Sequence, residues 1–202
     1  MTPAPDIFLS DWITSLAGHV DVIDHLMTLL ACDFFMPVAM SLYLLYLWFG
    51  TRDPVTRVKN QYGAMCASAS LGLANLGVQF FNMGIKFDPW DRPFEVHPSA
   101  RDAAETVFYM PHDPSFPANV AAVTFGAAMG MFFYNRRASI VLFALGFALS
   151  FARVYAGVHY PLDIAGGAVI GVIMAYVSRF LLRFFWPLPT FCFWVARKLY
   201  VA

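Results

Sequence analysis

The chain has 202 residues, of which 59% are hydrophobic and 17% aromatic, while only 13% are charged. Its mean hydropathy of +0.60 is far above that of a soluble domain and indicates a membrane protein. The formal net charge is zero and the sequence has no basic run of the kind that follows a phosphate backbone. We therefore exclude nucleic-acid binding.

Two apolar segments at the ends of the chain are too short to cross a bilayer. The first twenty residues carry no Lys or Arg before their apolar stretch and no small-residue cleavage pattern after it, so we expect them to be retained rather than removed as a signal peptide. Residues 7–20 and 186–200 contain Pro or polar side chains. We expect both segments to lie in the membrane interface.

Five other stretches are long and apolar enough to span the membrane. A helix needs roughly 20 residues to cross a hydrocarbon core of about 30 Å. The sequence thus predicts one all-α domain over residues 1–202, a polytopic integral membrane helix bundle, with spans at 26–50, 62–85, 117–135, 138–157 and 163–184.

The positive charges indicate which side of the bundle faces the cytoplasm, because short cytoplasmic loops collect Lys and Arg. One side holds the larger group: Arg52, Arg57, Lys59, Arg136, Arg137, Arg179, Arg183, Arg197 and Lys198. We expect this side, and with it the C-terminus, to be cytoplasmic. The opposite, extracytoplasmic side holds Lys86, Arg92, Arg101 and Arg153.

The longest connection, residues 86–116, also falls on the extracytoplasmic side. It is rich in Pro, Asp and aromatic residues and contains His97 and His112. A connection this long is more often functional than idle, so we expect it to cover a site. Small residues at 126–130 and 166–171 favour close helix packing, either within one chain or in a homodimer.

The stretch "SFARVYAGVHYPLDIAGG" places Arg153, His159 and Asp163 where the fourth span ends and the fifth begins. Pro161 favours the first turn of a helix, so Asp163 is expected at a helix N-terminus, one turn after His159. A carboxylate there holds the imidazole in one tautomer and leaves its other nitrogen as a nucleophile toward phosphorus. Each residue alone fits an interfacial anchor, but the three together favour a functional site.

Two further cations fall on the same side, in "NMGIKFDPWDRPF". Lys86 follows the second span and Arg92 comes six residues later. If they meet Arg153 in space, the three form an anion site that needs no metal. The alternatives are a snorkelling Lys86 and an Arg92 paired with a neighbouring aspartate.

Taken together, these motifs resemble the type 2 phosphatidic acid phosphatase superfamily. The segments that carry the likeness are Lys86, "RPF" at 92–94, "PHDPSFP" at 111–117 and "ARVYAGVHYPLDIAGG" at 152–167. The soluble relatives of this superfamily are vanadium haloperoxidases, and the likeness is greatest to the small bacterial undecaprenyl pyrophosphate phosphatases. The resemblance implies a hydrolase without cofactor or metal in the bacterial inner membrane, acting on a lipid phosphate at the outer leaflet. It implies that Lys86, Arg92 and Arg153 bind phosphate, that His159 becomes a phosphohistidine and that Asp163 orients it.

The middle motif departs from the family pattern of Pro, Ser, a small or polar residue and His. The sequence instead has Pro117, Ala118, Asn119 and Val120, so the phosphate-binding Ser and the His that protonates the leaving group are both replaced. Asn119 and the free N–H groups of the helix that begins here are candidate phosphate donors. His112 is a candidate substitute acid, although an exposed loop His explains it as well.

Two functions therefore stay open. One is a lipid phosphatase acting on a polyprenyl (undecaprenyl) diphosphate, whose leaving phosphate needs no proton; a phosphotransferase would use the same residues. The other is a catalytically impaired member that binds a lipid phosphate or serves as a subunit beside a membrane protein partner. Transport has little support, since Asp33 is the one charge several residues inside a span and is expected to be satisfied by neighbouring helices or the interface.

Overall fold

The computed structural model describes residues 6–84, 91–107, 110–111 and 114–199. All secondary structure in these ranges is helical, which confirms the predicted all-α class. The helices are α1 (Ile7–Thr14), α2 (Asp21–Ala31), α3 (Phe35–Phe49), α4 (Pro54–Gly84), α5 (Pro93–Val96), α6 (Pro98–Val107), α7 (Asn119–Phe132), α8 (Arg136–Tyr155), α9 (Pro161–Phe184) and α10 (Pro187–Lys198).

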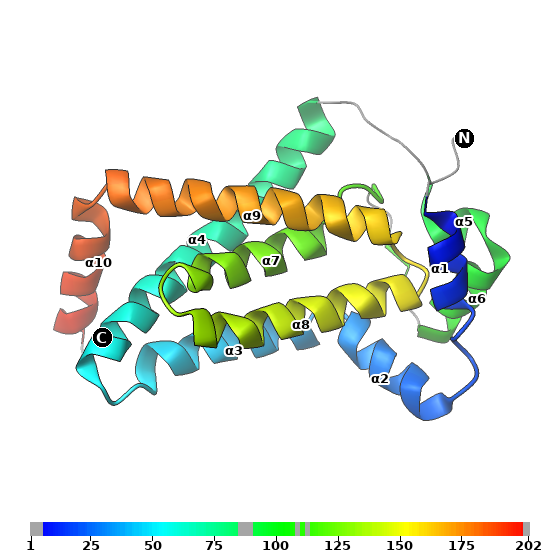
Figure 1. Cartoon of the computed structure of the whole chain (residues 1–202), viewed down its shortest axis with the longest axis horizontal. Coiled ribbons are helices and arrows are strands. Elements are labelled where there is room, and N and C mark those ends of the chain that lie inside the picture. Colours follow the sequence, from blue (N-terminus) through cyan, green and yellow to red (C-terminus); the bar gives the residue numbers. More distant parts are fainter. Residues whose placement is uncertain (1–5, 85–90, 108–109, 112–113, 200–202) are drawn as a thin grey trace.

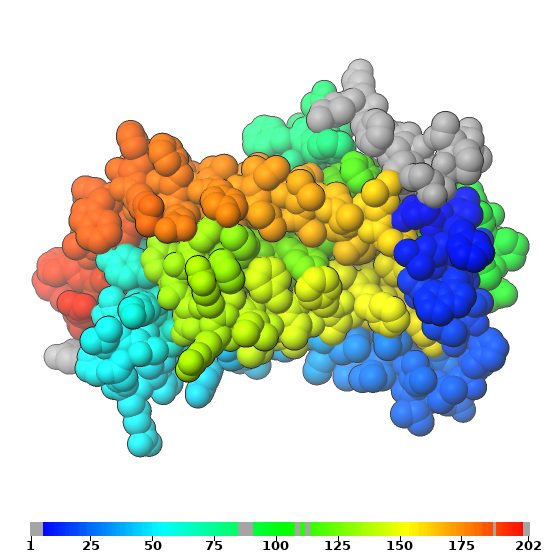
Figure 2. Space-filling view, viewed as in Figure 1, coloured from blue at the N-terminus to red at the C-terminus, as the bar shows by residue number. Residues whose placement is uncertain are grey.

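The helix α7 forms the centre of the bundle. It packs along α4, α8 and α9 (Figure 1), and most of its side chains are buried. The short helices α1, α5 and α6 lie at the end of the bundle where α8 joins α9, and α10 lies at the opposite end. In the space-filling view α8 and α9 form much of the near face, and α1 covers the end at their junction (Figure 2).

Three helices, α4, α8 and α9, are long and apolar enough to cross a membrane. The pair α2 and α3 passes the same test as one span bent by 61°. The predicted first span thus corresponds to two helices separated at residues 32–34. The predicted third span is the 14-residue α7, which at 1.5 Å per residue is about 21 Å long, short of a hydrocarbon core of about 30 Å. By length and composition the described helices give three spans, or four if α2 and α3 form one, where the sequence predicts five. Large apolar side chains such as Phe80, Phe147 and Phe180 point outward, as expected of a surface that faces lipid.

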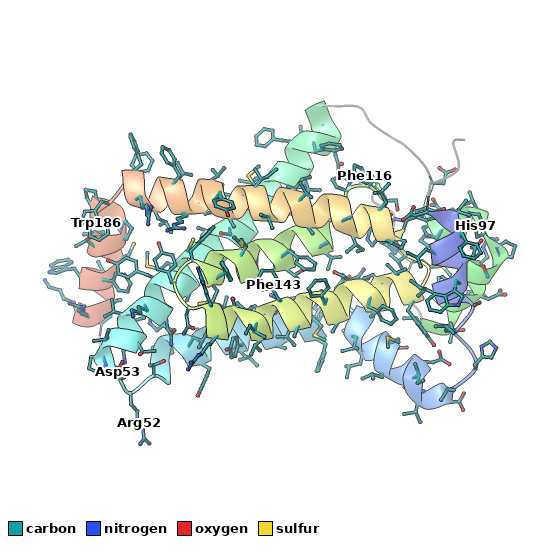
Figure 3. The ribbon with its side chains drawn as sticks, in the orientation of Figure 1. Arg52, Asp53, His97, Phe116, Phe143 and Trp186 are labelled. Carbon is teal, nitrogen blue, oxygen red and sulfur yellow. The ribbon has the colours of Figure 1, made fainter. Side chains whose placement is uncertain are left out.

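The connections with the most positive charges lie at the end of the bundle that carries α10. Arg52 is labelled at that end and His97 at the other (Figure 3). The helices therefore separate the described members of the two groups of charges as the sequence predicts. Which end faces the cytoplasm stays a prediction. The predicted connection 86–116 contains α5 and α6, and Lys86 and His112 lie outside the described residues.

Two glycines of α9 allow the backbones of α7 and α9 to approach closely. A Cβ at Gly167 would collide with the carbonyl oxygen of Ala118, and one at Gly171 would collide with that of Ala122. A Cβ at Gly171 would also lie 2.8 Å from the backbone nitrogen of Gly126. Because backbone atoms cannot move aside as a side chain can, the small residues found in the sequence serve packing within this chain.

We expect Gly171→Ala to destabilise the protein, because overpacking a close contact typically costs about 1–3 kcal/mol. Thermal unfolding in detergent measures the effect as a fall in Tm. Gly72→Ala is the matched control: a Cβ at this exposed α4 position meets nothing within 4 Å, and Ala is the better helix former. A variant at Gly171 as stable as the control would contradict the tight α7–α9 contact.

Candidate active site

The site is a cavity of about 210 Å³ at the end of the bundle where α8 joins α9. It brings together residues from four separate parts of the chain: Asp33, Pro37, Arg92, Pro111, Asn119, Val120, Val123, Arg153 and His159. Of the predicted site residues, Arg92, Asn119, Arg153 and His159 line this cavity. Asp163 lies behind His159, and the predicted contributions of Lys86 and His112 fall outside the described residues.

His159 lies in the connection between α8 and α9, with only 5% of its side chain exposed. Its Nδ1 is 3.1 Å from the carbonyl oxygen of Ser115. Because a carbonyl oxygen can only accept, this hydrogen bond places the proton on Nδ1 and leaves the lone pair on Nε2. The Nη1 atom of Arg92 is 3.5 Å from Nε2. The unprotonated nitrogen is therefore on the cationic side of the ring.

Asp163 acts on His159 less directly than the sequence predicts. Its Oδ2 is 3.6 Å from Nδ1 of His159, longer than a hydrogen bond. The same oxygen accepts a 2.6 Å hydrogen bond from the Ser115 hydroxyl and a 2.8 Å bond from the backbone N–H of Tyr160. Asp163 therefore fixes the segment whose carbonyl oxygen holds the imidazole. Ser115 is a site residue that the sequence reasoning missed, although it lies within the "PHDPSFP" motif.

The protonation of His159 follows from its surroundings. Burial lowers the pKa of the imidazole below its ordinary value of 6.5, Asp163 opposes this shift, and the Arg92 and Arg153 guanidinium groups add to it. A neutral imidazole is the form that can act as a nucleophile.

Arg92 is held in place through its backbone and its side chain. Its backbone N–H donates to Glu95 Oε2 at 2.9 Å, and Nη1 donates to the carbonyl oxygen of Val158 at 2.9 Å. The start of α5 is joined to the α8–α9 connection by a hydrogen bond from Phe94 N–H to the oxygen of Gly157. Gly157 has a φ of +66°, and a Cβ there would collide with the backbone of Ala100. Only glycine suits this turn.

Arg153 lies in the last turn of α8 and is 3% exposed. Its Nη2 makes a 2.7 Å ion pair with Oδ1 of Asp33, whose side chain is 55% exposed. Asp33 lies between α2 and α3, where the helix is broken. This second missed residue has a sequence signal: it is a lone carboxylate in the apolar run 26–50. The expectation that neighbouring helices satisfy Asp33 agrees with the ion pair.

The N-terminus of α7 forms another wall of the cavity. The N-cap residue of this helix is Ala118, whose side chain cannot accept a hydrogen bond, and its first residues, Asn119 and Val120, both line the cavity. Free N–H groups at a helix N-terminus favour an anion. The amide nitrogen of Asn119 donates to Asn75 Oδ1 at 3.0 Å. The amide nitrogen of Asn119 has a second N–H, so a phosphate contact is compatible with this bond, and it stays a prediction.

The cavity can hold an anion beside a nucleophile. Among its described lining residues, two buried guanidinium groups and one helix N-terminus face one carboxylate and a neutral imidazole. Arg is well suited to phosphate because its N–H groups form a planar fork. Among the residues described here, no three His, Cys, Asp or Glu side chains group as metal ligands would.

The chain is similar to known proteins along most of its length. Undecaprenyl-diphosphatase BcrC of Bacillus subtilis is 28% identical over 166 residues, or 82% of this chain and 78% of that protein. A putative undecaprenyl-diphosphatase, YbjG of Escherichia coli, is 30% identical over 163 residues, or 80% of this chain and 70% of that protein.

The crystal structure of Aquifex aeolicus LpxE has the same fold. It superposes with a TM-score of 0.55 at 22% identity and covers 87% of this chain and 95% of that one. The family model described as the PAP2 superfamily matches residues 63–187, which include Arg92, Arg153, His159 and Asp163. The chain belongs to the PAP2 superfamily, the type 2 phosphatidic acid phosphatases that its motifs resemble.

Proposed function

We propose that the protein is an integral membrane lipid phosphatase that hydrolyses a polyprenyl diphosphate at the outer leaflet of a bacterial inner membrane. The observation that carries this proposal is the 3.1 Å contact between Nδ1 of His159 and the carbonyl oxygen of Ser115. It requires the proton on Nδ1 and so leaves the lone pair on Nε2, the nitrogen beside Arg92. The names of the two undecaprenyl-diphosphatase relatives support the same substrate class.

In the proposed reaction, Nε2 of His159 attacks the terminal phosphorus and the bond to the leaving phosphate breaks. Arg92, Arg153 and the N-terminus of α7 hold the phosphoryl oxygens, and Lys86 is expected to join them. Water then cleaves the phosphohistidine, releasing phosphate and restoring the imidazole. The stabilisation comes from donors held in place before the substrate arrives.

The choice of a diphosphate follows from the apolar wall of the cavity. Val120 and Val123 line it on the α7 side, and neither can donate a proton. A phosphate monoester expels an alkoxide, which needs an acid, whereas a diphosphate expels a phosphate that cations stabilise. The same wall favours the second candidate, a protein that binds a lipid phosphate without turning it over.

His159→Ala is expected to lower phosphate release from undecaprenyl diphosphate by more than about 1,000-fold, because it removes the nucleophile. The assay compares purified variants in detergent with undecaprenyl diphosphate and with phosphatidate. His97→Ala is the control, since His97 lies at the same end of the molecule but does not line the cavity. Release that survives in the His159 variant would exclude the phosphohistidine. Binding of the lipid without release by the unaltered protein would favour the second candidate.

Restoring a general acid should broaden the substrate range. Because Val120 lines the cavity, we expect Ala118→Ser with Val120→His to raise phosphatidate hydrolysis by about 100-fold or more, the usual contribution of a general acid. The diphosphate should gain much less. Val123→His places an imidazole one turn further along the same wall and tests whether position matters. Equal gains in phosphatidate hydrolysis from the two His variants would contradict the prediction that the acid has to stand at position 120.

The formation of the phosphohistidine should persist at acidic pH. Only neutral His159 is nucleophilic, and burial lowers the pKa of His159, so the neutral form survives below pH 6.5. A single-turnover assay of phosphohistidine formation against pH should therefore lose rate only below about pH 6.5, the ordinary value for a histidine. If the rate instead falls to half at a pH above 6.5, the pKa of His159 is not lowered and the prediction is wrong.

A further inference from the structure

Asp33 lines the candidate active site because it lies in the short connection between α2 and α3. The chain leaves α2 at Ala31 and enters α3 at Phe35, and the two helices are bent by 61°. The break brings the Asp33 carboxylate to Nη2 of Arg153 at 2.7 Å, in the cavity that His159 also lines. With 55% of its side chain exposed, Asp33 faces both the cavity and the outside of the protein.

The proposed function, on which this inference rests, requires a proton acceptor in its second half. When water attacks the phosphohistidine, an O–P bond forms, the N–P bond breaks and the water must lose a proton. His159 cannot accept this proton, because Nε2 carries the phosphoryl group and Nδ1–H donates to Ser115. Arginine has no lone pair to offer. Another group has to act as the base.

The described walls of the cavity leave one candidate. Besides the two arginines and His159, the lining residues are Asp33, the Asn119 amide and side chains of Pro and Val. The amide, Pro and Val side chains are not bases. Asp163 is fully buried behind the imidazole, where its Oδ2 accepts bonds from Ser115 and Tyr160. Asp33 is the carboxylate that faces the cavity.

We propose that Asp33 is the general base that activates water for hydrolysis of the phosphohistidine. The guanidinium of Arg153 has five N–H donors, so it can hold Asp33 through Nη2 and phosphoryl oxygens through the others. A water molecule takes up about 30 Å³, so a cavity of about 210 Å³ has room for a phosphoryl group and water. The arrangement places the carboxylate beside the water that attacks.

The protons and electrons of this step balance without another reactant. Asp33 takes one proton from water while the water oxygen bonds to phosphorus. The electron pair of the breaking N–P bond returns to Nε2, which regenerates the neutral imidazole. Phosphate leaves, and the exposed Asp33 carboxyl group gives its proton to the solvent.

Asp33→Asn tests the proposal because it keeps the shape and an oxygen that accepts from Arg153 but removes the base. With undecaprenyl diphosphate radiolabelled in its terminal phosphate, we expect phosphohistidine to form nearly as fast as in the unaltered protein. Its hydrolysis should slow by about 100-fold to 10,000-fold, the usual contribution of a general base. Rapid mixing would then show a burst of one undecaprenyl phosphate per protein and acid-labile label on His159.

Two further measurements separate the base from a merely structural role. Asp21→Asn, which changes an exposed carboxylate of α2 outside the cavity, should leave both steps unchanged. Added formate, a small carboxylate, should restore hydrolysis in the Asp33 variant. Equal slowing of both steps without rescue would show that Asp33 only positions Arg153, and unchanged turnover would exclude any role; either result overturns the proposal. An unaltered protein that neither forms phosphohistidine nor releases phosphate would instead overturn the proposed function itself.

Discussion

The hydrogen bond between His159 Nδ1 and the carbonyl oxygen of Ser115 determines how the whole site is arranged. It fixes the tautomer, and it does so through a backbone atom whose position depends on Asp163. The carboxylate holds the Ser115 hydroxyl, while the Asp163 carbonyl oxygen accepts from the backbone N–H of Ala118. The start of α9 thus positions both the imidazole and the start of α7.

The close packing of α7 against α9 makes this arrangement possible. Glycines at 167 and 171 let the two backbones touch, so the N-terminus of the short α7 lies against the start of α9 and opens into the cavity. The small residues of α9 therefore help to place a helix N-terminus beside two buried cations.

The helical class and the core of the site were predictable from the sequence, because both depend on local spacing. Arg153, His159 and Asp163 lie within eleven residues of one another, and the turn between two helices brings them together. Ser115 contacts His159, 44 residues away, and Asp163, 48 residues away. The contact with His159 is made by a backbone carbonyl oxygen, so the pattern of side chains in the sequence does not reveal it. The break at residues 32–34 was missed because hydropathy is averaged over a full span.

The Asp33–Arg153 pair explains why a carboxylate is tolerated in a cavity suited to anions. A guanidinium that is 3% exposed is costly without a negative partner, and Asp33 provides one when no substrate is present. A bound phosphoryl group takes over much of this neutralisation, while the remaining N–H donors of Arg153 keep the carboxylate nearby. In the proposed mechanism, the residue that neutralises Arg153 is then also the residue that receives a proton from water. For the proposed diphosphate substrate, an apolar wall at Val120 is therefore compatible with turnover: its leaving phosphate needs no acid, and the proposed base lies in the connection between α2 and α3.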